Sequence, residues 1–506
     1  MSRKDTICAV STASGVGAIA VIRLSGKESH KIALNIFRKK NGNQLDINNI
    51  EANKAYFGEV FDPIPDDKPM VDEVLITFFK APHSYTGEDS VEISCHGSVF
   101  VQQKIMELLC VRGCRLAEPG EFSKRAYIYD KMDLAQAEAV ADLIASQNEA
   151  EHRIAVNQLK GGFSNELREL RAQLVDLTSL LELELDFSEE DVEFADRKKL
   201  YDLLNKSMKH IKNLSDSFRL GNAIKNGIPV AIVGETNTGK STLLNAILGE
   251  DRAIVSDIEG TTRDTIEETF NIEGTLYRFI DTAGIRETSE TIEKIGIERT
   301  FKKIAEADIV IGLLDGTKPI KDIIKAWKDI VNRVNLLKQN LIIMVNKSDI
   351  MDAAKMFTLN DDYIDYMKST YEKNIEKHGG YMTDEYCYSI TGMDLYNIQG
   401  LLTFSYMSAK NPEDIENLKS SIRYRYTDMP HIDENTTLVT NIRHFEALTH
   451  ALESLQQVKD GMDNKLLVDL LAQDLRQALY HIGSITGEVT SDEVLGNIFG
   501  RFCIGK

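Results

Sequence analysis

The stretch IPVAIVGETNTGKSTLLNAIL, residues 228–248, decides the fold of the central part of this chain. An apolar run with strand character leads into GETNTGKS, Gly234 to Ser241, which fits the phosphate-loop pattern GxxxxGK[ST], and a helical pattern follows. In such a loop, glycines let backbone amides face phosphate groups, and the helix N-terminus adds its positive end. Lys240 could reach the β- and γ-phosphates, and the Ser241 hydroxyl could bind Mg²⁺. Taken alone, the pattern also fits an ordinary glycine-rich turn.

Two motifs downstream are suited to magnesium and phosphate contacts. DTAG, Asp281 to Gly284, ends an apolar run, so that its aspartate could hold Mg²⁺ through water and its last amide could contact the γ-phosphate. GTTRD, residues 260–264, lies between the phosphate loop and DTAG, and its Thr262 could be the second hydroxyl ligand of Mg²⁺. Both motifs favour a nucleotide site over a simple turn.

Two further motifs fit a guanine base. NKSD, Asn346 to Asp349, ends a later strand pattern, and the Asp349 carboxylate could accept both N–H donors of a guanine edge, which adenine does not offer. SAK, Ser408 to Lys410, ends the last strand pattern, where the Ala409 amide could meet the guanine oxygen. Five elements in this order predict a GTP-binding domain.

The motifs do not identify which residue activates water for GTP hydrolysis. Many small GTPases carry Gln after DTAG to orient the attacking water, but this chain has Ile285. Three acids follow, Glu287, Glu290 and Glu293, and spacing does not choose among them. Asn237, inside the phosphate loop, could help to bind a monovalent cation, but a local Asx-type hydrogen bond is the interpretation that physical chemistry favours.

Length and composition indicate a folded protein of about three domains, since the chain has 506 residues, 42% of them apolar and 27% charged. The formal charge of −20 argues against a large non-specific nucleic-acid surface. The six cysteines show no zinc-site spacing, and no apolar run of about 18 residues exists. The first residues, MSRKDTICAV, contain no signal-peptide core, so we expect a cytoplasmic protein with reduced thiols and no membrane span.

The spacing of apolar residues changes along the chain. Residues 1–127 predict an α+β domain, and 128–221 predict long helices; 222–435 alternate strands and helices, and 436–506 return to helical spacing. The simplest interpretation is an α/β domain inserted into a helical domain whose two halves pack together.

Residues 350–407 separate two strands of the inserted domain and carry eight tyrosines, at positions 363, 366, 371, 381, 386, 388, 396 and 406. A surface insertion with small helices of its own is the favoured interpretation. A partner-contact surface is the alternative, because tyrosine is enriched at interfaces.

Motifs along nearly the whole chain resemble the tRNA modification GTPase family MnmE, also called TrmE. The matching stretches include SYTGEDSVEISCHG near the N-terminus, LELELDFSEEDVEF in the helical region, IDTAGIRETSETIEKIGIER after the phosphate loop, and GEVTSDEVLGNIFGRFCIGK at the end. The resemblance implies a multidomain α/β fold: an N-terminal α+β domain that binds tetrahydrofolate and dimerises, a discontinuous helical domain, and an inserted Ras-like P-loop GTPase domain.

The resemblance also implies partners and chemistry. Members are homodimers and form a heterotetramer with the FAD-binding protein MnmG, or GidA, which would carry most of the tRNA contact. Together they place an aminomethyl-type group on carbon 5 of the wobble uridine, position 34, of certain tRNAs. The one-carbon donor is a tetrahydrofolate derivative similar to 5-formyltetrahydrofolate. GTP hydrolysis needs Mg²⁺ and is stimulated by K⁺-dependent pairing of the GTPase domains.

Residue roles follow from the same resemblance. Glu293 matches the acid that acts through water as general base. Lys240 and Cys503 are the other two residues expected to take part in catalysis, with the Cys503 thiol beside the folate site. The Mg²⁺ ligands are expected to be Ser241 and Thr262; the K⁺ ligands are Asn237, Ser256, Ile258 and Thr261; the folate contacts are Arg23, Glu92, Lys131 and Lys506. The residues expected to bind GTP are Asn237, Thr238, Gly239, Lys240, Ser241, Thr242, Ser256, Asp257, Ile258, Glu259, Gly260, Thr261, Thr262, Asp281, Thr282, Ala283, Gly284, Asn346, Lys347, Asp349, Ser408, Ala409 and Lys410.

Other interpretations stay open at this point. Taken singly, Arg23, Glu92 and Lys131 also fit surface ion pairs. A ribosome-assembly GTPase would be a binding switch without tRNA chemistry, although the chain has no KH-like GXXG unit or basic tail. A folate-dependent transferase with a merely regulatory GTPase domain is the third alternative.

Overall fold

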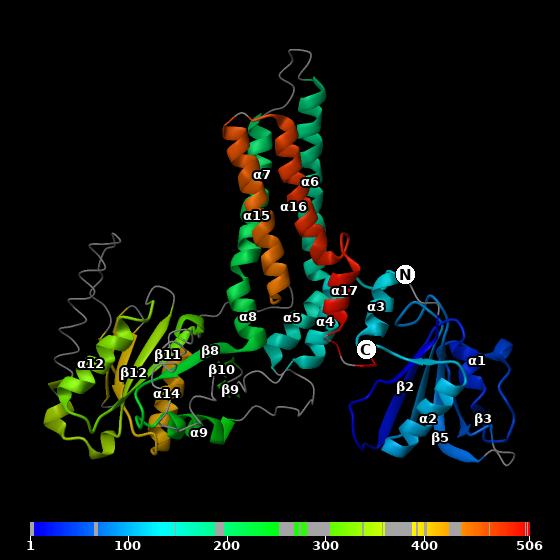
Figure 1. Cartoon of the computed structure of the whole chain (residues 1–506), viewed down its shortest axis with the longest axis horizontal. Coiled ribbons are helices and arrows are strands. Elements are labelled where there is room, and N and C mark those ends of the chain that lie inside the picture. The colour runs from blue at the N-terminus through cyan, green and yellow to red at the C-terminus, as the bar shows by residue number, and fades with distance from the viewer. Residues whose placement is uncertain are drawn as a thin grey trace.

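The computed structural model places three bodies in a row, a sheet at each side and a tall helical bundle between them (Figure 1). It describes residues 5–64, 69–146, 148–187, 197–251, 268–272, 275–280, 304–335, 339–356, 358–359, 387–390, 393–398, 402–424, 437–464, 466–500, 502 and 504–505. The multidomain α/β class is confirmed. No described helix combines the length and apolar character that crossing a membrane requires.

The N-terminal body is a seven-stranded sheet in the order β3-β4-β5-β6-β2-β1-β7. Its strands are β1 (Ile7–Val10), β2 (Ile19–Ser25), β3 (Phe37–Lys39), β4 (Ala55–Phe61), β5 (Met70–Phe79), β6 (Ser90–His96) and β7 (Arg115–Leu116). Its helices are α1 (Ser29–Leu34), the short η1 (Ile47–Asn49), α2 (Val99–Val111) and α3 (Glu121–Ile128).

Alternation along these strands separates two faces of the sheet. Ile22, Ile76 and Ile93 point to one face and pack with Ile105 and Leu108 of α2 in a buried core. The intervening residues point to the opposite face, where the α3 residue Phe122 packs with Ile7 and Ala9 of β1. That opposite face therefore carries the polar side chains of β2 and β6.

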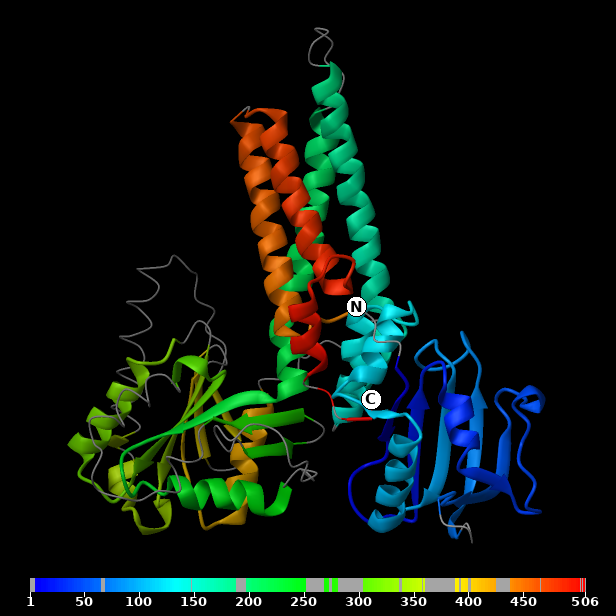
Figure 2. The same ribbon diagram turned by 45° about the vertical axis from the view of Figure 1, so that its right-hand side comes forward.

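The helical bundle is built from both ends of the chain. Its helices are α4 (Leu134–Ala145), α5 (Glu149–Leu159), α6 (Gly162–Phe187), α7 (Arg197–Asp216), α8 (Phe218–Asn226), α15 (Ile442–Asp463), α16 (Val468–Thr486) and α17 (Asp492–Phe499). Leu174 of α6 and Leu204 of α7 share one buried core with Leu448 of α15 and Leu475 of α16. Figure 2 shows these four long helices side by side.

A buried polar cluster also joins the two halves of the bundle. Glu138 of α4 accepts hydrogen bonds at 2.8 Å from Arg443 and at 2.7 Å from His444, both at the start of α15. Burial raises the pKa of Glu138, but His444 and Arg443 outweigh it and lower the pKa to about 2. The carboxylate is therefore ionised, and its partners are more than 300 residues away in sequence.

The second sheet has eight strands in the order β13-β14-β15-β12-β11-β8-β10-β9. The strands are β8 (Ile228–Val233), β9 (Glu268–Ile272), β10 (Thr275–Phe279), β11 (Ile309–Asp315), β12 (Asn340–Asn346), β13 (Cys387–Ile390), β14 (Met393–Ile398) and β15 (Leu402–Tyr406). The helices are α9 (Lys240–Asp251), α12 (Ile320–Val331), η3 (Ser348–Ile350) and α14 (Pro412–Tyr424). The central strands β10, β8, β11, β12 and β15 are parallel, as the short apolar runs predict.

The edges of this sheet differ from the sequence-based expectation. β9 pairs antiparallel with β10, and β13 and β14 add an antiparallel hairpin beside β15. The hairpin lies within residues 350–407, where we expected a surface insertion with small helices of its own, and the expected helices are wrong for 387–390 and 393–398. The insertion also contains a helical turn at 353–356. Its residues 360–386 lie outside the described part of the chain.

Candidate nucleotide and one-carbon donor sites

The phosphate loop connects the fully buried strand β8 to helix α9 at the carboxyl edge of the parallel strands. A Cβ atom at Gly234 would lie 2.3 Å from the carbonyl oxygen of Leu313 in β11. Gly239 has φ +99°, and a Cβ atom there would lie 2.3 Å from the Asn346 amide nitrogen. Both glycines are therefore required by close packing against neighbouring strands, and at Gly239 also by the backbone conformation.

Lys240 follows the phosphate loop at the start of α9, and its side chain folds back over the loop. Its ammonium group donates hydrogen bonds to the carbonyl oxygens of Gly234 at 2.8 Å and Glu235 at 2.6 Å. The Thr238 hydroxyl donates to the same Glu235 carbonyl at 3.0 Å, and the Glu235 carboxylate forms an ion pair with Lys318 after β11. The loop thus presents a positive charge where the phosphates of a nucleotide would bind. Ser241 and Thr242 follow in the first turn of α9.

Asn346 joins three motifs that are distant in sequence. Its side chain is buried, donates to the Thr238 carbonyl at 2.7 Å, and accepts from the Ala409 N–H at 2.9 Å. The Ser408 N–H in turn donates to Asp414 of α14 at 2.7 Å. The Ala409 N–H is thus engaged by Asn346, and a guanine oxygen would have to share it.

Asp315, at the end of β11, is a site neighbour that the motifs did not reveal. It forms a 2.6 Å ion pair with Lys347, which has φ +65°, and accepts a 2.6 Å hydrogen bond from the Thr317 hydroxyl. Burial raises the pKa of Asp315, but Lys347 and Thr317 outweigh it and lower the pKa below its usual range. Asp349, two residues after Lys347, is exposed in η3, so the carboxylate expected to contact guanine is accessible. The position of Asp315 at a strand end was the available signal.

Asn237 has φ +64° and is exposed. Its side chain makes no hydrogen bond to any other described residue, so the expected Asx-type bond is not found there. Its amide oxygen is suited to a hard cation such as K⁺. Ser256, Asp257, Ile258, Glu259, Gly260, Thr261, Thr262, Asp281, Thr282, Ala283, Gly284 and Glu293 lie outside the described residues.

The second candidate site lies on the N-terminal sheet, on the face opposite α1 and α2. Arg23 and Glu92 are directly opposite each other in the β2–β6 register, and their side chains form a 2.8 Å ion pair that is partly exposed. The Arg23 guanidinium also lies 5.0 Å above the Tyr85 ring and 5.8 Å from the Phe122 ring. A cation, a carboxylate and two aromatic rings therefore meet here, which fits the polar edge and flat ring of a pterin.

Lys131 contacts the loop 81–89, which lies beside the Arg23–Glu92 pair. Its ammonium group donates to the Pro82 carbonyl at 3.0 Å rather than to an acid, so the surface ion pair considered for it is not found among the described residues. A Cβ atom at Gly87, which has φ +82°, would lie 3.3 Å from the Lys131 side chain. The loop carries Tyr85 as well, so it connects Lys131 to the Arg23–Glu92 pair.

The end of the chain contacts the N-terminal sheet. The Gly505 carbonyl accepts a 3.1 Å hydrogen bond from the Ser11 hydroxyl, and a Cβ atom at Gly505 would lie 2.2 Å from the Val10 carbonyl. Val10 follows Ala9, which is opposite Arg23 in the β1–β2 register. The residues at 503 and 506, Cys503 and Lys506, lie outside the described part, but their neighbours bring the tail to this sheet.

Among the described residues, no group of three or more His, Cys, Asp or Glu side chains could hold a metal ion.

Comparisons with known proteins cover almost the whole chain. The family model described as GTP-binding protein TrmE N-terminus matches residues 6–131, and that of the MnmE helical domain matches residues 134–503. A Parabacteroides distasonis protein named tRNA modification GTPase MnmE is 48% identical over 503 residues, covering 99% of this chain and 100% of that protein. A Flavobacterium johnsoniae protein of the same name is 47% identical over 509 residues, covering 100% of both chains. A crystal structure of Aquifex aeolicus Era with GDP and AlF4⁻ is 26% identical, with a TM-score of 0.24, and covers 45% of this chain and 66% of that one.

Proposed function

The chain belongs to the MnmE family of tRNA modification GTPases, and from this premise we propose the chemistry that its GTP hydrolysis serves. The chain acts with an FAD-binding MnmG (GidA) partner on carbon 5 of the wobble uridine, position 34, of certain tRNAs. The product carries an aminomethyl-type group whose carbon comes from a tetrahydrofolate derivative.

One observation supports the assignment of the nucleotide site above all others. The side chain of Asn346 links the phosphate loop to the SAK motif through Thr238 and Ala409. These two hydrogen bonds hold the phosphate loop and the SAK motif at a fixed distance from each other. This arrangement supports a site for one nucleotide, with Lys240 at the phosphates and with Asp349 at the base, where its carboxylate would favour guanine.

The metal ions have separate proposed ligands. Ser241 and Thr262 would hold Mg²⁺, and Asn237, Ser256, Ile258 and Thr261 would hold K⁺. Mg²⁺ and K⁺ would supply positive charge beside the bridging and terminal phosphate oxygens. Glu293 would orient the attacking water through a second water, since Ile285 has no group to do so.

The proposed one-carbon donor site comprises Arg23, Glu92, Lys131 and Lys506, with Cys503 beside it. The contact between Gly505 and Ser11 supports including the tail, because Gly505 directly precedes Lys506 in sequence. A carboxylate such as Glu92 suits the aminopyrimidine edge of a folate, and the lysines suit its glutamate tail.

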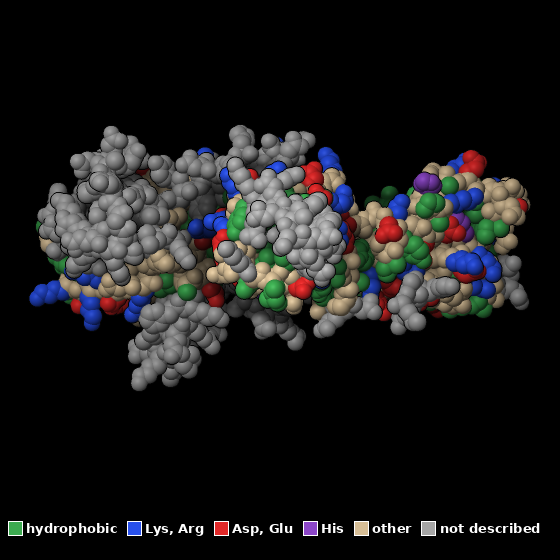
Figure 3. All heavy atoms as spheres, turned by 90° about the horizontal axis from the view of Figure 1, so that it is seen from above, with side chains coloured by type: hydrophobic (Ala, Val, Ile, Leu, Met, Phe, Trp, Pro, Cys, Tyr) green, Lys and Arg blue, Asp and Glu red, His purple; other side chains and the backbone are tan. Residues whose placement is uncertain are grey.

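The proposed assembly is a homodimer through the N-terminal domains, joined by the flavin partner in a heterotetramer. On the face seen from above, acidic and basic side chains are both scattered among the described residues (Figure 3). Together with the formal charge of −20, this supports a division in which the partner makes most of the tRNA contact.

Affinity purification of the tagged full-length chain from its own cells tests this function. We expect an FAD-binding protein and tRNA in the eluate, identified by flavin absorbance, mass spectrometry and RNA sequencing. Ribosomal subunits in place of the flavoprotein would favour the ribosome-assembly alternative. Modification of tRNA by the isolated chain without a flavin partner would instead favour the folate-dependent transferase.

Replacing Na⁺ by K⁺ at constant ionic strength is expected to raise the GTP hydrolysis rate by roughly tenfold or more, since added charge at the phosphates acts where an arginine finger does. The measurement is phosphate release at saturating GTP in each salt. Rb⁺, which is close to K⁺ in size, should activate in a similar way. Equal rates in Na⁺ and K⁺ would remove the potassium site from the proposal.

A further inference from the structure

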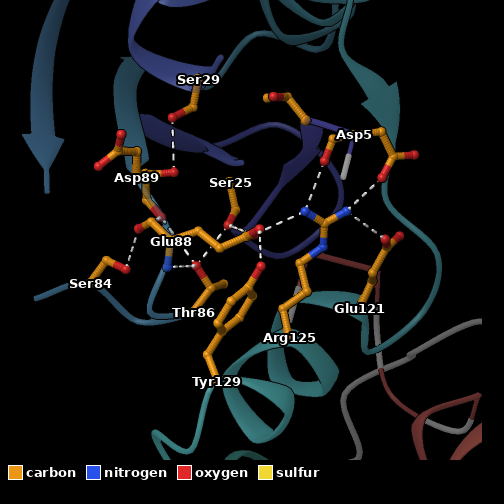
Figure 4. Close-up of polar contacts among 12 residues, drawn as sticks. Asp5, Ser25, Ser29, Ser84, Thr86, Glu88, Asp89, Glu121, Arg125 and Tyr129 are labelled. Atoms are coloured by element: carbon orange, nitrogen blue, oxygen red, sulfur yellow. Dashed lines mark hydrogen bonds and ion pairs between the residues drawn. The ribbon is translucent and has the colours of Figure 1, made fainter. Parts of the chain in front are cut away.

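A buried arginine next to the proposed one-carbon donor site has no assigned role. Arg125 lies in α3, and its side chain is only 7% exposed. Its guanidinium donates to the Asp5 carbonyl at 2.9 Å, to the Asp5 carboxylate at 3.0 Å, to Glu121 at 3.0 Å and to Glu88 at 2.9 Å (Figure 4). One side chain thus joins the N-terminal strand, helix α3 and the loop 81–89.

The contact with Glu88 reaches furthest into that loop. The Glu88 carboxylate also accepts from the Ser25 hydroxyl at 2.9 Å and from the Tyr129 hydroxyl at 3.1 Å, as Figure 4 shows. The Ser25 hydroxyl in turn lies 2.7 Å from the buried Thr86 hydroxyl. Both carboxylate oxygens are therefore used, and the loop is held from β2, from α3 and from the end of α3.

This loop carries the residues that bring the proposed donor site together. Tyr85 stacks on Arg23 and its hydroxyl lies 2.8 Å from that of Ser123 in α3, while Pro82 accepts the hydrogen bond from Lys131. Without the ion pair to Arg125, Glu88 would keep its hydrogen bonds from Ser25 and Tyr129, but the loop that carries Tyr85 and Pro82 would lose its ion pair with α3. Tyr85, which contacts Arg23, and Pro82, which contacts Lys131, would then be held less firmly in place.

We propose that Arg125 is a positioning residue for the tetrahydrofolate derivative, because its ion pair with Glu88 fixes the loop 81–89 over the Arg23–Glu92 pair. This inference rests on the proposed function, since it concerns the same donor site. Arg125 itself is buried beneath the loop and does not need to touch the donor. A site held by such a supporting layer binds its ligand without first ordering the loop.

The chain provides a matched control in Arg115. Arg115 also pairs with Asp5, at 2.7 Å, and with Glu121, at 2.6 Å, but its described contacts do not include the loop 81–89. Its side chain is 30% exposed. Arg115→Gln and Arg125→Gln therefore both remove ion pairs with the same two acids, and only the second also removes the ion pair with Glu88.

The test measures binding of 5-formyltetrahydrofolate to the full-length chain by calorimetry. We expect Arg125→Gln to weaken binding by roughly tenfold or more, the scale of loss from a slightly misplaced site. Arg115→Gln should change affinity by about twofold at most. Both variants should melt at lower temperature, and GTP hydrolysis should be unchanged in both. Equal affinity for Arg125→Gln and Arg115→Gln would overturn the positioning role.

Glu88→Gln gives a second, independent measure that does not depend on the folding of Arg125 variants. Because Glu88 and Arg125 act through one contact, each single substitution and the double substitution should weaken binding to a similar extent. Losses that add in the double variant would overturn the inference. If the unaltered chain fails to bind the folate, the donor-site proposal itself falls, and this inference falls with it.

Discussion

Asp349→Asn is expected to weaken GTP binding by roughly 100-fold or more, because a hydrogen bond to a charged group contributes about 1.5–3 kcal/mol and two such bonds are affected. In the unaltered chain, the carboxylate would accept from both N–H donors of the guanine edge. An asparagine keeps one acceptor and places an N–H₂ group against the second donor, which leaves both groups unsatisfied. Asp349 lies in η3, which begins two residues after the buried Asn346 at the end of β12.

The same variant should gain affinity for xanthosine triphosphate. Xanthine carries a carbonyl where guanine carries its amino group, so an asparagine amide can donate to the carbonyl and accept from the ring N–H. Titration of a fluorescent nucleotide with GTP and with xanthosine triphosphate measures the change of preference. Asp352→Asn is the control, since Asp352 is an exposed acid three residues further on. An unchanged preference in Asp349→Asn would show that this motif does not contact the base.

Glu293→Ala is expected to lower the rate of GTP hydrolysis by roughly 10²–10⁴, the usual contribution of a positioned general base. The dissociation constant for GTP should stay within about twofold, because Glu293 would act on the attacking water and not on the nucleotide. Single-turnover hydrolysis in K⁺ together with equilibrium binding separates the two effects.

Glu287→Ala and Glu290→Ala are the matched controls for this prediction, since all three acids follow the DTAG motif. The family resemblance gives these two acids no role in hydrolysis, so both variants should hydrolyse GTP at nearly the rate of the unaltered chain. A large loss in Glu290→Ala with normal turnover in Glu293→Ala would assign the role to the other acid.

Much of the nucleotide site could be predicted from sequence because its requirements are local. A phosphate loop needs glycine where the backbone approaches a neighbouring strand, and the structure gives Gly234 and Gly239 those close approaches. Strand ends at the carboxyl edge of a parallel sheet necessarily meet, so the order of the motifs predicts their proximity. The contribution of Asp315 was missed, because its partner Lys347 becomes a neighbour only when β11 and β12 pair.

The edges of the second sheet could not be predicted in the same way. The segments that form β13 and β14 follow a long tyrosine-rich stretch, and their pattern does not distinguish a hairpin from short helices. Their pairing depends on the free edge of β15, which a sequence pattern cannot display. The tertiary context therefore overrides the local preference at this edge.

By itself, the sequence determined the chain's class, its guanosine-nucleotide motifs and the family resemblance, because each depends on residues within a few turns of one another. The tertiary structure decided the Glu138 cluster, the Gly505 contact with Ser11 and the Arg125 network, whose members lie far apart in sequence. Such contacts form only when separate elements pack, since their free energy depends on burial and on geometry that no single segment contains. For this reason the role of the buried Arg125 beside the proposed donor site could be inferred only from the structure.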